Sequence, residues 1–210
     1  MTNHKNILIL APHTDDGELG CGGAISRFIS EDKNVFYASF SLCRQSLQPG
    51  LNPDTLENEL RAATRILGIS PINLRLFDFE VRRFKQYRQE ILETLILIRN
   101  EIQPDLVLLP SPTDTHQDHQ VISEEGLRAF KNSSVLGYEM PWNNFSFNTR
   151  CFITLKQEQL QKKIDALKEY KSQEYRAYLN ADFLKGLAIT RGVQINAEFA
   201  EAFEVIRWIY

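Results

Sequence analysis

The sequence lacks a long apolar run, a leader-like segment and an even set of cysteines. No stretch reaches the roughly 20 apolar residues that span a bilayer, so no membrane-spanning helix is predicted. The first residues, MTNHKN, lead directly into an apolar segment, and we therefore expect no signal peptide. The three cysteines, Cys21, Cys43 and Cys151, do not have the spacing of a metal site. Reduced thiols and a cytoplasmic location are expected, with Cys21 as a small buried residue.

The chain also lacks an excess of positive charge. It has 24 Lys and Arg against 27 Asp and Glu, a formal net charge of −3, whereas nucleic acids and anionic membranes select a basic face. We therefore expect neither a nucleic-acid partner nor insertion into a membrane. No repeat or low-complexity linker divides the 210 residues, and this length suits one domain with a sizeable core. A single domain over residues 1–210 is predicted.

The N-terminal glycines do not form a nucleotide-binding motif. The segment APHTDDGELGCGG, residues 11–23, follows the apolar run NILIL. In a G-x-G-x-x-G fingerprint that starts at Gly20, the third glycine would fall at Ile25. The Gly-Lys-Ser/Thr of a Walker A loop is absent as well. A nucleotide-binding Rossmann module is therefore disfavoured, and the glycines are expected to let a helix pack closely on a sheet.

Short apolar runs that end in turn signals alternate with segments of helical periodicity. The predicted strands are 7–11, 35–40, 73–77, 106–110, 135–138 and 151–155. The predicted helices are 22–29, 53–67 between an Asn52 cap and Gly68, 87–102, a weaker one at 126–130, and 157–170. This alternation predicts an α/β fold with a mostly parallel sheet and helices on both faces.

Two of the predicted strands end in polar loops that are rich in possible metal ligands. His13, Asp15 and Asp16 follow the first strand; Asp114, His116, Asp118 and His119 follow strand 106–110. Ligands of open parallel sheets collect where the strand order reverses, so both loops would face one crevice if the two strands are neighbours. Imidazole and carboxylate together suit zinc or a similar divalent ion. Two ligands from the first loop and one from the second would leave a position open for water, as in catalytic zinc sites.

The remaining residues of these loops suggest acid–base chemistry. Asp15, beside a ligand, is placed to act as a base on bound water, and one of His116 and His119 is left to polarise a substrate or move a proton. Either loop alone also fits a structural role, because aspartates after strands often cap helices or form turns. The ligand types shared by both loops favour the functional interpretation.

The segments PHTDDGELGCGG and DTHQDH together resemble the PIG-L/LmbE-like family of zinc-dependent N-acetylglucosaminyl deacetylases. NELRAATRILGI, KIDALKEYKSQ and RGVQINAEFAEAF are similar to further family segments, so the resemblance spans nearly the whole chain. It implies a Rossmann-like αβα sandwich and removal of an N-acetyl group from a glucosamine-type amino sugar, with release of acetate. It also implies Zn²⁺ or another divalent metal as cofactor, a small amino-sugar derivative as partner and, as often in this family, a homo-oligomer.

The resemblance further implies a role for each loop residue. The implied metal ligands are His13, Asp16 and His119. Asp15 would be the general base, His116 would assist at the carbonyl oxygen, and Asp118 would orient a histidine. The chain departs from the family pattern at Thr14 and Gly17, and neither departure removes a ligand or the base.

Weaker candidates for substrate binding lie outside the two loops. Arg44 follows the second predicted strand, and Arg83 belongs to a basic cluster with Arg82, Lys85 and Arg88 after the third. Such arginines would hold a phosphate or carboxylate, although a solvated helix face explains the cluster equally well.

Aromatic and C-terminal residues add further candidates. Trp142 would stack on a sugar face, although packing is the commoner role of a lone tryptophan. Arg191, in TRG, resembles the C-terminal segment of the family and would help to build the pocket. Trp208 is expected in the core, and His4 is expected to be exposed in a polar tail.

Two functions of different classes follow from these motifs. The first is a zinc-dependent amide hydrolase acting on an amino sugar. The alternative is a non-catalytic, metal-bearing sugar-binding protein. A degenerate binder has no need of the base Asp15, so its presence favours the enzyme.

Overall fold

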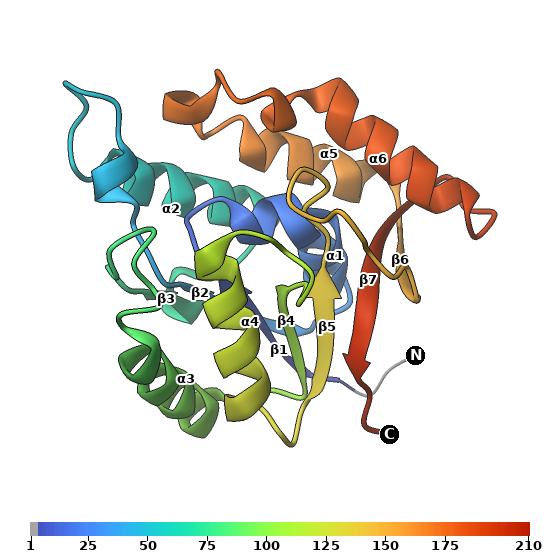
Figure 1. Cartoon of the computed structure of the whole chain (residues 1–210). Helices are drawn as coiled ribbons and strands as arrows, with labels where there is room; N and C mark the ends of the chain where they lie inside the picture. The colour runs from blue at the N-terminus through green and yellow to red at the C-terminus, as the bar shows by residue number, and fades with distance from the viewer. Residues whose placement is uncertain (1–3) are drawn as a thin grey trace.

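A seven-stranded sheet runs through the computed structural model, which describes residues 4–210 (Figure 1). The strands are β1 (Asn6–Ala11), β2 (Asn34–Ser39), β3 (Leu74–Leu76), β4 (Leu106–Pro110), β5 (Ser134–Tyr138), β6 (Cys151–Leu155) and β7 (Phe199–Arg207). They lie in the order β3-β2-β1-β4-β5-β7-β6, with β1 to β5 parallel and β7 antiparallel to both neighbours. This confirms the six strands and the mostly parallel sheet that the sequence predicts.

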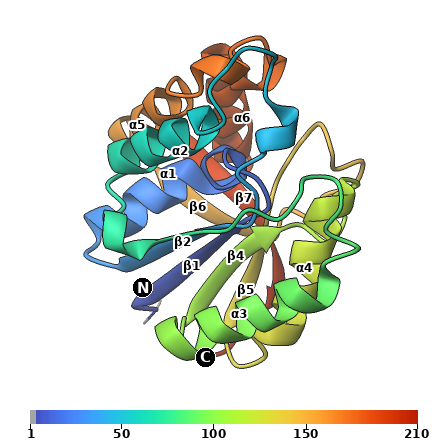
Figure 2. The same cartoon turned by 90° about the vertical axis from the view of Figure 1, so that its left-hand side faces the viewer.

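Six α-helices in residues 4–210 cover the two faces of the sheet. They are α1 (Asp16–Ser30), α2 (Thr55–Leu67), α3 (Arg88–Ile102), α4 (Gln117–Ala129), α5 (Gln157–Leu167) and α6 (Ala181–Val193). Short 3₁₀ turns lie at Arg44–Ser46, Pro71–Asn73, Lys171–Gln173 and Ala177–Leu179. Figure 2 shows α3 and α4 on one face and the other four helices on the opposite face. The arrangement is the expected three-layer αβα sandwich.

The order of the strands reverses between β1 and β4, which are direct parallel neighbours. Ile7 lies opposite Leu106, and Ile9 lies opposite Leu108. From β1 the chain continues to β2 on one side of the sheet, whereas β4 leads to β5 on the other side. The loops that follow β1 and β4 therefore begin side by side, at the place where open α/β sheets bind ligands.

Strand β1 is buried on both faces because it lies in the middle layer. Ile7 and Ile9 pack into the core below α1 and α5, and Leu8 and Leu10 pack into the core below α3 and α4. Burying each of these side chains contributes about 1.5–3 kcal/mol. A strand buried on both sides reads as a continuous apolar run, which explains the segment NILIL.

Close packing of α1 on the sheet explains the glycines of this segment. A Cβ at Gly17 would lie 2.4 Å from the Tyr37 ring on β2, and one at Gly20 would lie 2.4 Å from the Tyr138 ring on β5. A larger residue at either position would push the helix away from the sheet. The glycines thus serve helix packing, as the sequence predicts.

Helix α1 is longer than its periodicity indicates. The predicted helix 22–29 is only its second half, because backbone torsions at Cys21 (φ −149°) interrupt the helix. The carboxylate of Glu201 on β7 accepts hydrogen bonds from the N–H groups of Gly23 (3.0 Å) and Ala24 (2.7 Å). This contact from a distant strand caps the second half of the helix as a separate start. The first half, which contains Gly17 and Gly20, lacks the apolar periodicity from which a helix is predicted.

Other helix boundaries differ from the expected ones for local reasons. Helix α2 begins at Thr55, and Asn52 instead accepts a hydrogen bond from the Asp54 N–H (2.8 Å), so Asn52 is not its cap. Gly68 ends α2 in the left-handed conformation (φ +94°), as predicted. Helix α4 begins at Gln117 rather than near residue 126, because its first turn is polar and faces the site. Helix α5 ends at Leu167, short of residue 170.

Two C-terminal elements, and the exposure of two side chains, Trp208 and His4, differ from expectation. Helix α6 and strand β7 have no counterpart among the predicted elements. Trp208 is 44% exposed rather than in the core, because it lies just past the end of β7. His4 is 9% exposed rather than in a free tail, because its Nε2 lies 3.1 Å from the Ser134 Oγ and its ring packs edge-on against Trp208.

All three cysteines are free thiols, and Cys21 is fully buried, as expected. Among the helices described here, none combines the length and the apolar character needed to cross a membrane.

Candidate active site

The loop after β1 brings a histidine and a carboxylate together at the start of α1. The backbone N–H of His13 donates a hydrogen bond to Asp16 Oδ2 (2.8 Å), and the His13 Nδ1 lies 3.0 Å from the same oxygen. Asp16 is the first residue of α1, where the positive end of the helix dipole favours a carboxylate. Both side chains are buried.

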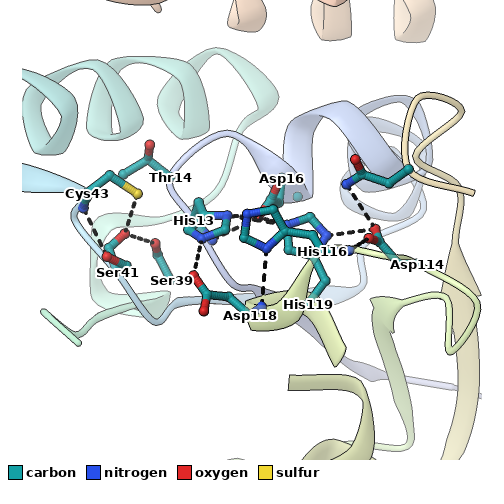
Figure 3. Close-up of polar contacts among 12 residues, drawn as sticks. His13, Thr14, Asp16, Ser39, Ser41, Cys43, Asp114, His116, Asp118 and His119 are labelled. Atoms are coloured by element: carbon teal, nitrogen blue, oxygen red, sulfur yellow. Dashed lines mark hydrogen bonds and ion pairs between the residues drawn. The ribbon is translucent and has the colours of Figure 1, made fainter. Parts of the chain in front are cut away.

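His119, on the first turn of α4, completes a triangle of possible ligand atoms (Figure 3). Its Nε2 lies 3.2 Å from Asp16 Oδ2 and 3.3 Å from His13 Nδ1. Tetrahedral zinc with bonds of about 2.0–2.1 Å places its ligand atoms about 3.3 Å apart. With the third side at 3.0 Å, the triangle matches one face of such a coordination sphere.

His116 lies at the edge of this triangle. Ligand nitrogens of His13, His116 and His119 all lie within 4.8 Å of one another, so the three histidines alone also form a possible ligand set. The Asp16 oxygen is the better third ligand, because it lies within 3.2 Å of nitrogens on both buried histidines. The metal set implied by the resemblance is therefore brought together, with His116 beside it.

Carboxylates behind the two histidines determine which ring nitrogens face the triangle. His119 Nδ1 lies 2.7 Å from Asp114 Oδ2, and His13 Nε2 lies 3.1 Å from Asp118 Oδ2. A carboxylate only accepts, so these two nitrogens are the protonated ones. His13 Nδ1 and His119 Nε2 are then the nitrogens that face Asp16, and a bound cation would take the place of a proton between them. Such carboxylate–histidine pairs orient ligands in metal sites, and the donor set therefore fits a divalent cation.

Charges within the triangle favour a positive group at its centre. Burial opposes the charged form of His119, but Asp16 and then Asp114 raise the pKa of this histidine to about 10. Burial likewise opposes ionisation of Asp16, but His119 and His13 hold the pKa of this carboxyl well below its usual range. Positive charge is thus stabilised between these side chains, which is the environment that a bound cation needs.

His116 is the N-cap residue of α4 and faces the cleft as a neutral ring. Its Nδ1 accepts a hydrogen bond from the Asp118 N–H (3.2 Å). Burial, followed by the nearby His119 and His13, lowers the pKa of His116 to about 4. Because Nδ1 is an acceptor, the proton of the neutral ring is on Nε2. His116 is therefore arranged as a hydrogen-bond donor toward the cleft.

Asp15 directly precedes Asp16 in the chain and lines the same cleft as the triangle. Burial, and then the Asp16 carboxylate, raise the pKa of Asp15 to about 6, while Arg176 and His13 act in the opposite direction. A carboxyl with a pKa near neutrality is suited to accept and return a proton.

A cleft of about 320 Å³ opens over these groups. Among the predicted substrate-binding residues, Trp142 lines it, with its ring stacked on Tyr178 (centroids 4.2 Å apart, 11° between planes). The other three do not line it. Instead, Arg44 pairs with Asp54, Glu57 and Asp78; Arg83 pairs with Glu80; and Arg191 pairs with Glu139.

Sequence reasoning assigned no role to several residues of the site. Asp114 is noted only for its position before the histidines, and its contact to His119 joins the loop before α4 to the first turn of that helix. Gln173, Arg176 and Tyr178 line the cleft from the segment between α5 and α6. The segment KIDALKEYKSQ was the only signal that this region belongs to the site.

Tyr170, in the same segment, supports the loop that carries His13 and Asp16. The Tyr170 OH donates a hydrogen bond to the Thr14 carbonyl (2.6 Å) and lies 2.9 Å from Glu18 Oε1. Tyr37 contacts the same carbonyl (3.2 Å) and the other Glu18 oxygen. Burial raises the pKa of Glu18 to about 8. Thr14 is thus held through its carbonyl group, which does not depend on its side chain.

The sequence profile of the PIG-L family, described as GlcNAc-PI de-N-acetylase, matches residues 8–130. This span includes most of β1, all of β4 and both loops of the site. The chain belongs to this family of deacetylases.

Particular relatives agree with that assignment. The chain is 32% identical to the uncharacterized deacetylase YaiS of Escherichia coli K12 over 174 residues, which cover 80% of this chain and 91% of YaiS. It is 25% identical to the diacetylchitobiose deacetylase of Thermococcus kodakarensis over 98% of this chain and 85% of that enzyme.

The fold also occurs in a protein of different chemistry. The structure of GalB, the 4-carboxy-2-hydroxymuconate hydratase of Pseudomonas putida KT2440, matches with a TM-score of 0.82 over 98% of each chain. Its sequence identity is 20%, so the likeness shows the shared fold alone.

Proposed function

We propose that this protein is a metal-dependent, Zn²⁺-type amide hydrolase that removes the N-acetyl group from a glucosamine-type amino-sugar derivative. The observation that supports it most directly is the triangle of His13 Nδ1, Asp16 Oδ2 and His119 Nε2 at the floor of the cleft. The family assignment and the diacetylchitobiose deacetylase among the relatives support the acetamide and the amino sugar.

In this mechanism His13, Asp16 and His119 hold the cation, and Asp114 and Asp118 fix the two imidazoles. A bound divalent cation supplies Lewis acidity, which makes water a stronger acid and polarises a carbonyl oxygen. Asp15 accepts the proton of the water that attacks the acetyl carbon. The C–N bond then breaks, acetate leaves, and Asp15 returns the proton to the sugar amine.

His116 acts on the oxygen of the acetyl group. Its Nε2–H donates a hydrogen bond as negative charge develops on that oxygen, since its Nδ1 is occupied by the Asp118 N–H. Because the pKa of His116 is low, its ring is neutral and carries one proton, on Nε2. The ring therefore stabilises the oxyanion by a hydrogen bond rather than by a full positive charge. Trp142, stacked on Tyr178, offers an apolar surface for a sugar face.

The test is release of acetate from a panel of N-acetylglucosamine derivatives, with metal-loaded and chelator-treated enzyme. We expect acetate and free amine in equal amounts from at least one derivative, abolished by chelation and restored by Zn²⁺. Bound metal and sugar without any acetate would support the non-catalytic binder instead. A hydratase adds water to a double bond and releases no acetate, so the same assay separates that chemistry as well.

A further inference from the structure

The loop between β1 and α1, which we call the metal loop, is anchored to the rest of the protein in two ways. At its start, the Pro12 carbonyl accepts a hydrogen bond from the backbone N–H of Ser41 (3.0 Å), just after β2. Further along, the Thr14 carbonyl accepts a hydrogen bond from the hydroxyl of Tyr170 (2.6 Å) and lies 3.2 Å from that of Tyr37. This second anchor depends on side chains, so a substitution outside the loop can remove it.

The Thr14 carbonyl belongs to the peptide group that joins Thr14 to Asp15. A peptide group is planar, so the direction of this carbonyl also fixes the N–H and the Cα of Asp15. Asp15 is the proposed base, and the residues on either side of this pair, His13 and Asp16, are proposed metal ligands. One hydrogen bond to this oxygen therefore restrains the three groups that the metal loop supplies to the proposed mechanism.

Tyr170 reaches this carbonyl from a fixed position outside the metal loop. Its side chain is almost fully buried, and its hydroxyl also lies 2.9 Å from Glu18 Oε1 on α1. In the 3₁₀ turn that follows, Ser172 donates its backbone N–H (2.8 Å) and its hydroxyl (2.7 Å) to the carboxylate of Glu59 on α2. The position of the tyrosine is thus set by its own packing and by α2.

We propose that Tyr170 is a positioning residue, whose hydroxyl holds the peptide between Thr14 and Asp15 in the orientation that metal binding and proton transfer require. The inference rests on the proposed function, because it needs the metal loop to supply ligands and a base. Tyr170 acts through the backbone of the loop rather than on the substrate. Without its hydroxyl the loop has more conformations available, and ordering them when a cation binds costs free energy.

The chain contains a matched control for this hydrogen bond. Tyr138 on β5 is as completely buried as Tyr170, and its hydroxyl also donates to a backbone carbonyl, that of Leu10 (2.9 Å). Leu10 lies inside β1, where pairing with β2 holds the backbone. Tyr170→Phe and Tyr138→Phe therefore remove the same chemical group and the same kind of contact. They differ in whether the carbonyl that loses its partner belongs to the metal loop.

The test measures the Zn²⁺ affinity of the folded proteins by titration against a chromophoric chelator. Tyr170→Phe should bind Zn²⁺ about 10-fold more weakly than the wild type, and Tyr138→Phe should stay within about twofold of it. A role in folding alone lowers the stability of the metal-free and metal-bound forms alike, so it leaves this affinity unchanged. Wild-type affinity in Tyr170→Phe, or an equal loss in both variants, would overturn the proposal.

Turnover gives a second readout. At saturating Zn²⁺, Tyr170→Phe should lower kcat by about 10-fold and leave KM within about twofold, because the metal loop supplies the base whereas Trp142, proposed to contact the sugar, follows β5. An effect on KM alone would contradict the proposal.

Two further outcomes keep the test decisive. If Tyr170→Phe does not fold, Tyr37→Phe removes the longer contact to the same carbonyl, and an unchanged Zn²⁺ affinity there would overturn the proposal. If the wild type releases no acetate from any N-acetylglucosamine derivative, the proposed hydrolase is wrong. The difference in Zn²⁺ affinity between Tyr170→Phe and Tyr138→Phe still decides the role of Tyr170 in that case.

Discussion

Two buried clusters of charged side chains lie against helix α1, one at each half. At the start of the helix, Asp16 meets His13 and His119. Beside the second half, Glu201 meets Lys163 Nζ at 2.6 Å and accepts two backbone N–H groups of α1. Both clusters join segments far apart in the sequence, and all five of these side chains are buried.

The difference between them lies in how donors and acceptors are matched. In the Glu201 cluster a cation and two N–H groups face one carboxylate, so each polar atom has its partner. In the Asp16 cluster three possible ligand atoms converge on one point, while the far nitrogens of both imidazoles face Asp114 and Asp118. Only the second arrangement stabilises a positive group, a proton or a metal cation, between ligand atoms. Burial and charge alone do not identify a site; the convergence of ligand atoms does.

The largest expected effect is the loss of turnover in Asp15→Asn. Asparagine keeps the size of the side chain but accepts no proton from water, so kcat should fall by about 10²–10⁴-fold. Bound metal, measured by elemental analysis, should stay at the wild-type level. Asp32→Asn, which changes an exposed carboxylate just after α1, serves as the control. Near-normal turnover in Asp15→Asn would mean that another group acts as the base.

Removing the cation of the Glu201 cluster should affect folding rather than metal binding. Lys163→Met leaves Glu201 buried without its counter-charge, and the free energy of unfolding should fall by about 3–5 kcal/mol. Urea denaturation measures this, with chelator and with Zn²⁺. The double variant Lys163→Met/Glu201→Gln should recover part of the loss, because it removes the uncompensated charge. A loss below about 1 kcal/mol in Lys163→Met would contradict the structural role of the pair.

A substitution of Asp114, which contacts a histidine of the Asp16 cluster, should weaken metal binding without removing a ligand. Asp114→Asn removes the charge that orients His119, and metal affinity should fall by about 10–100-fold. Competition with a chromophoric chelator measures this affinity. Unaltered affinity would show that the contact between Asp114 and His119 does not support metal binding.

The smallest expected effect concerns His4, which lies far from both clusters. Burial lowers the pKa of His4 from 6.5, although Asp105 acts in the opposite direction. The folded state therefore binds fewer protons than the unfolded state. The contribution of this histidine is complete above pH 6.5 and is lost as the pH falls toward the lower pKa of the folded state.

This predicts a small change in the pH dependence of stability. Between about pH 8 and about pH 5, the wild type should lose less than about 1 kcal/mol more stability than His4→Asn. Urea denaturation of both proteins at the two pH values measures the difference. A variant that loses stability with acid as much as the wild type would show that His4 does not contribute.

The sequence predicts the parts of this structure that depend on local pattern. NILIL and LVLLP read as buried strands, and the polar loops after them contain the ligands that the fold brings together. The first half of α1 and strand β7 were not predicted. Glycines weaken the periodicity of α1, and the Glu201 contact that caps its second half comes from 177 residues away.

The substrate side of the site was the harder part to predict. Arg44 and Arg83 were selected from their positions after strands, but nearby carboxylates bind both. Arg82, the direct neighbour of Arg83, has a left-handed backbone conformation and lines the cleft, whereas Arg83 does not. Arg176 stands in a segment without regular periodicity. Which arginine of a cluster stays unpaired depends on contacts that the sequence does not show.

The most direct test of the central claim is a crystal structure of the Zn²⁺-loaded protein with anomalous data collected at the zinc edge. The account predicts one anomalous peak at about 2.0–2.2 Å from His13 Nδ1, Asp16 Oδ2 and His119 Nε2, with a solvent molecule in a further position. A peak elsewhere, or a cation whose every position is filled by side chains, would contradict it.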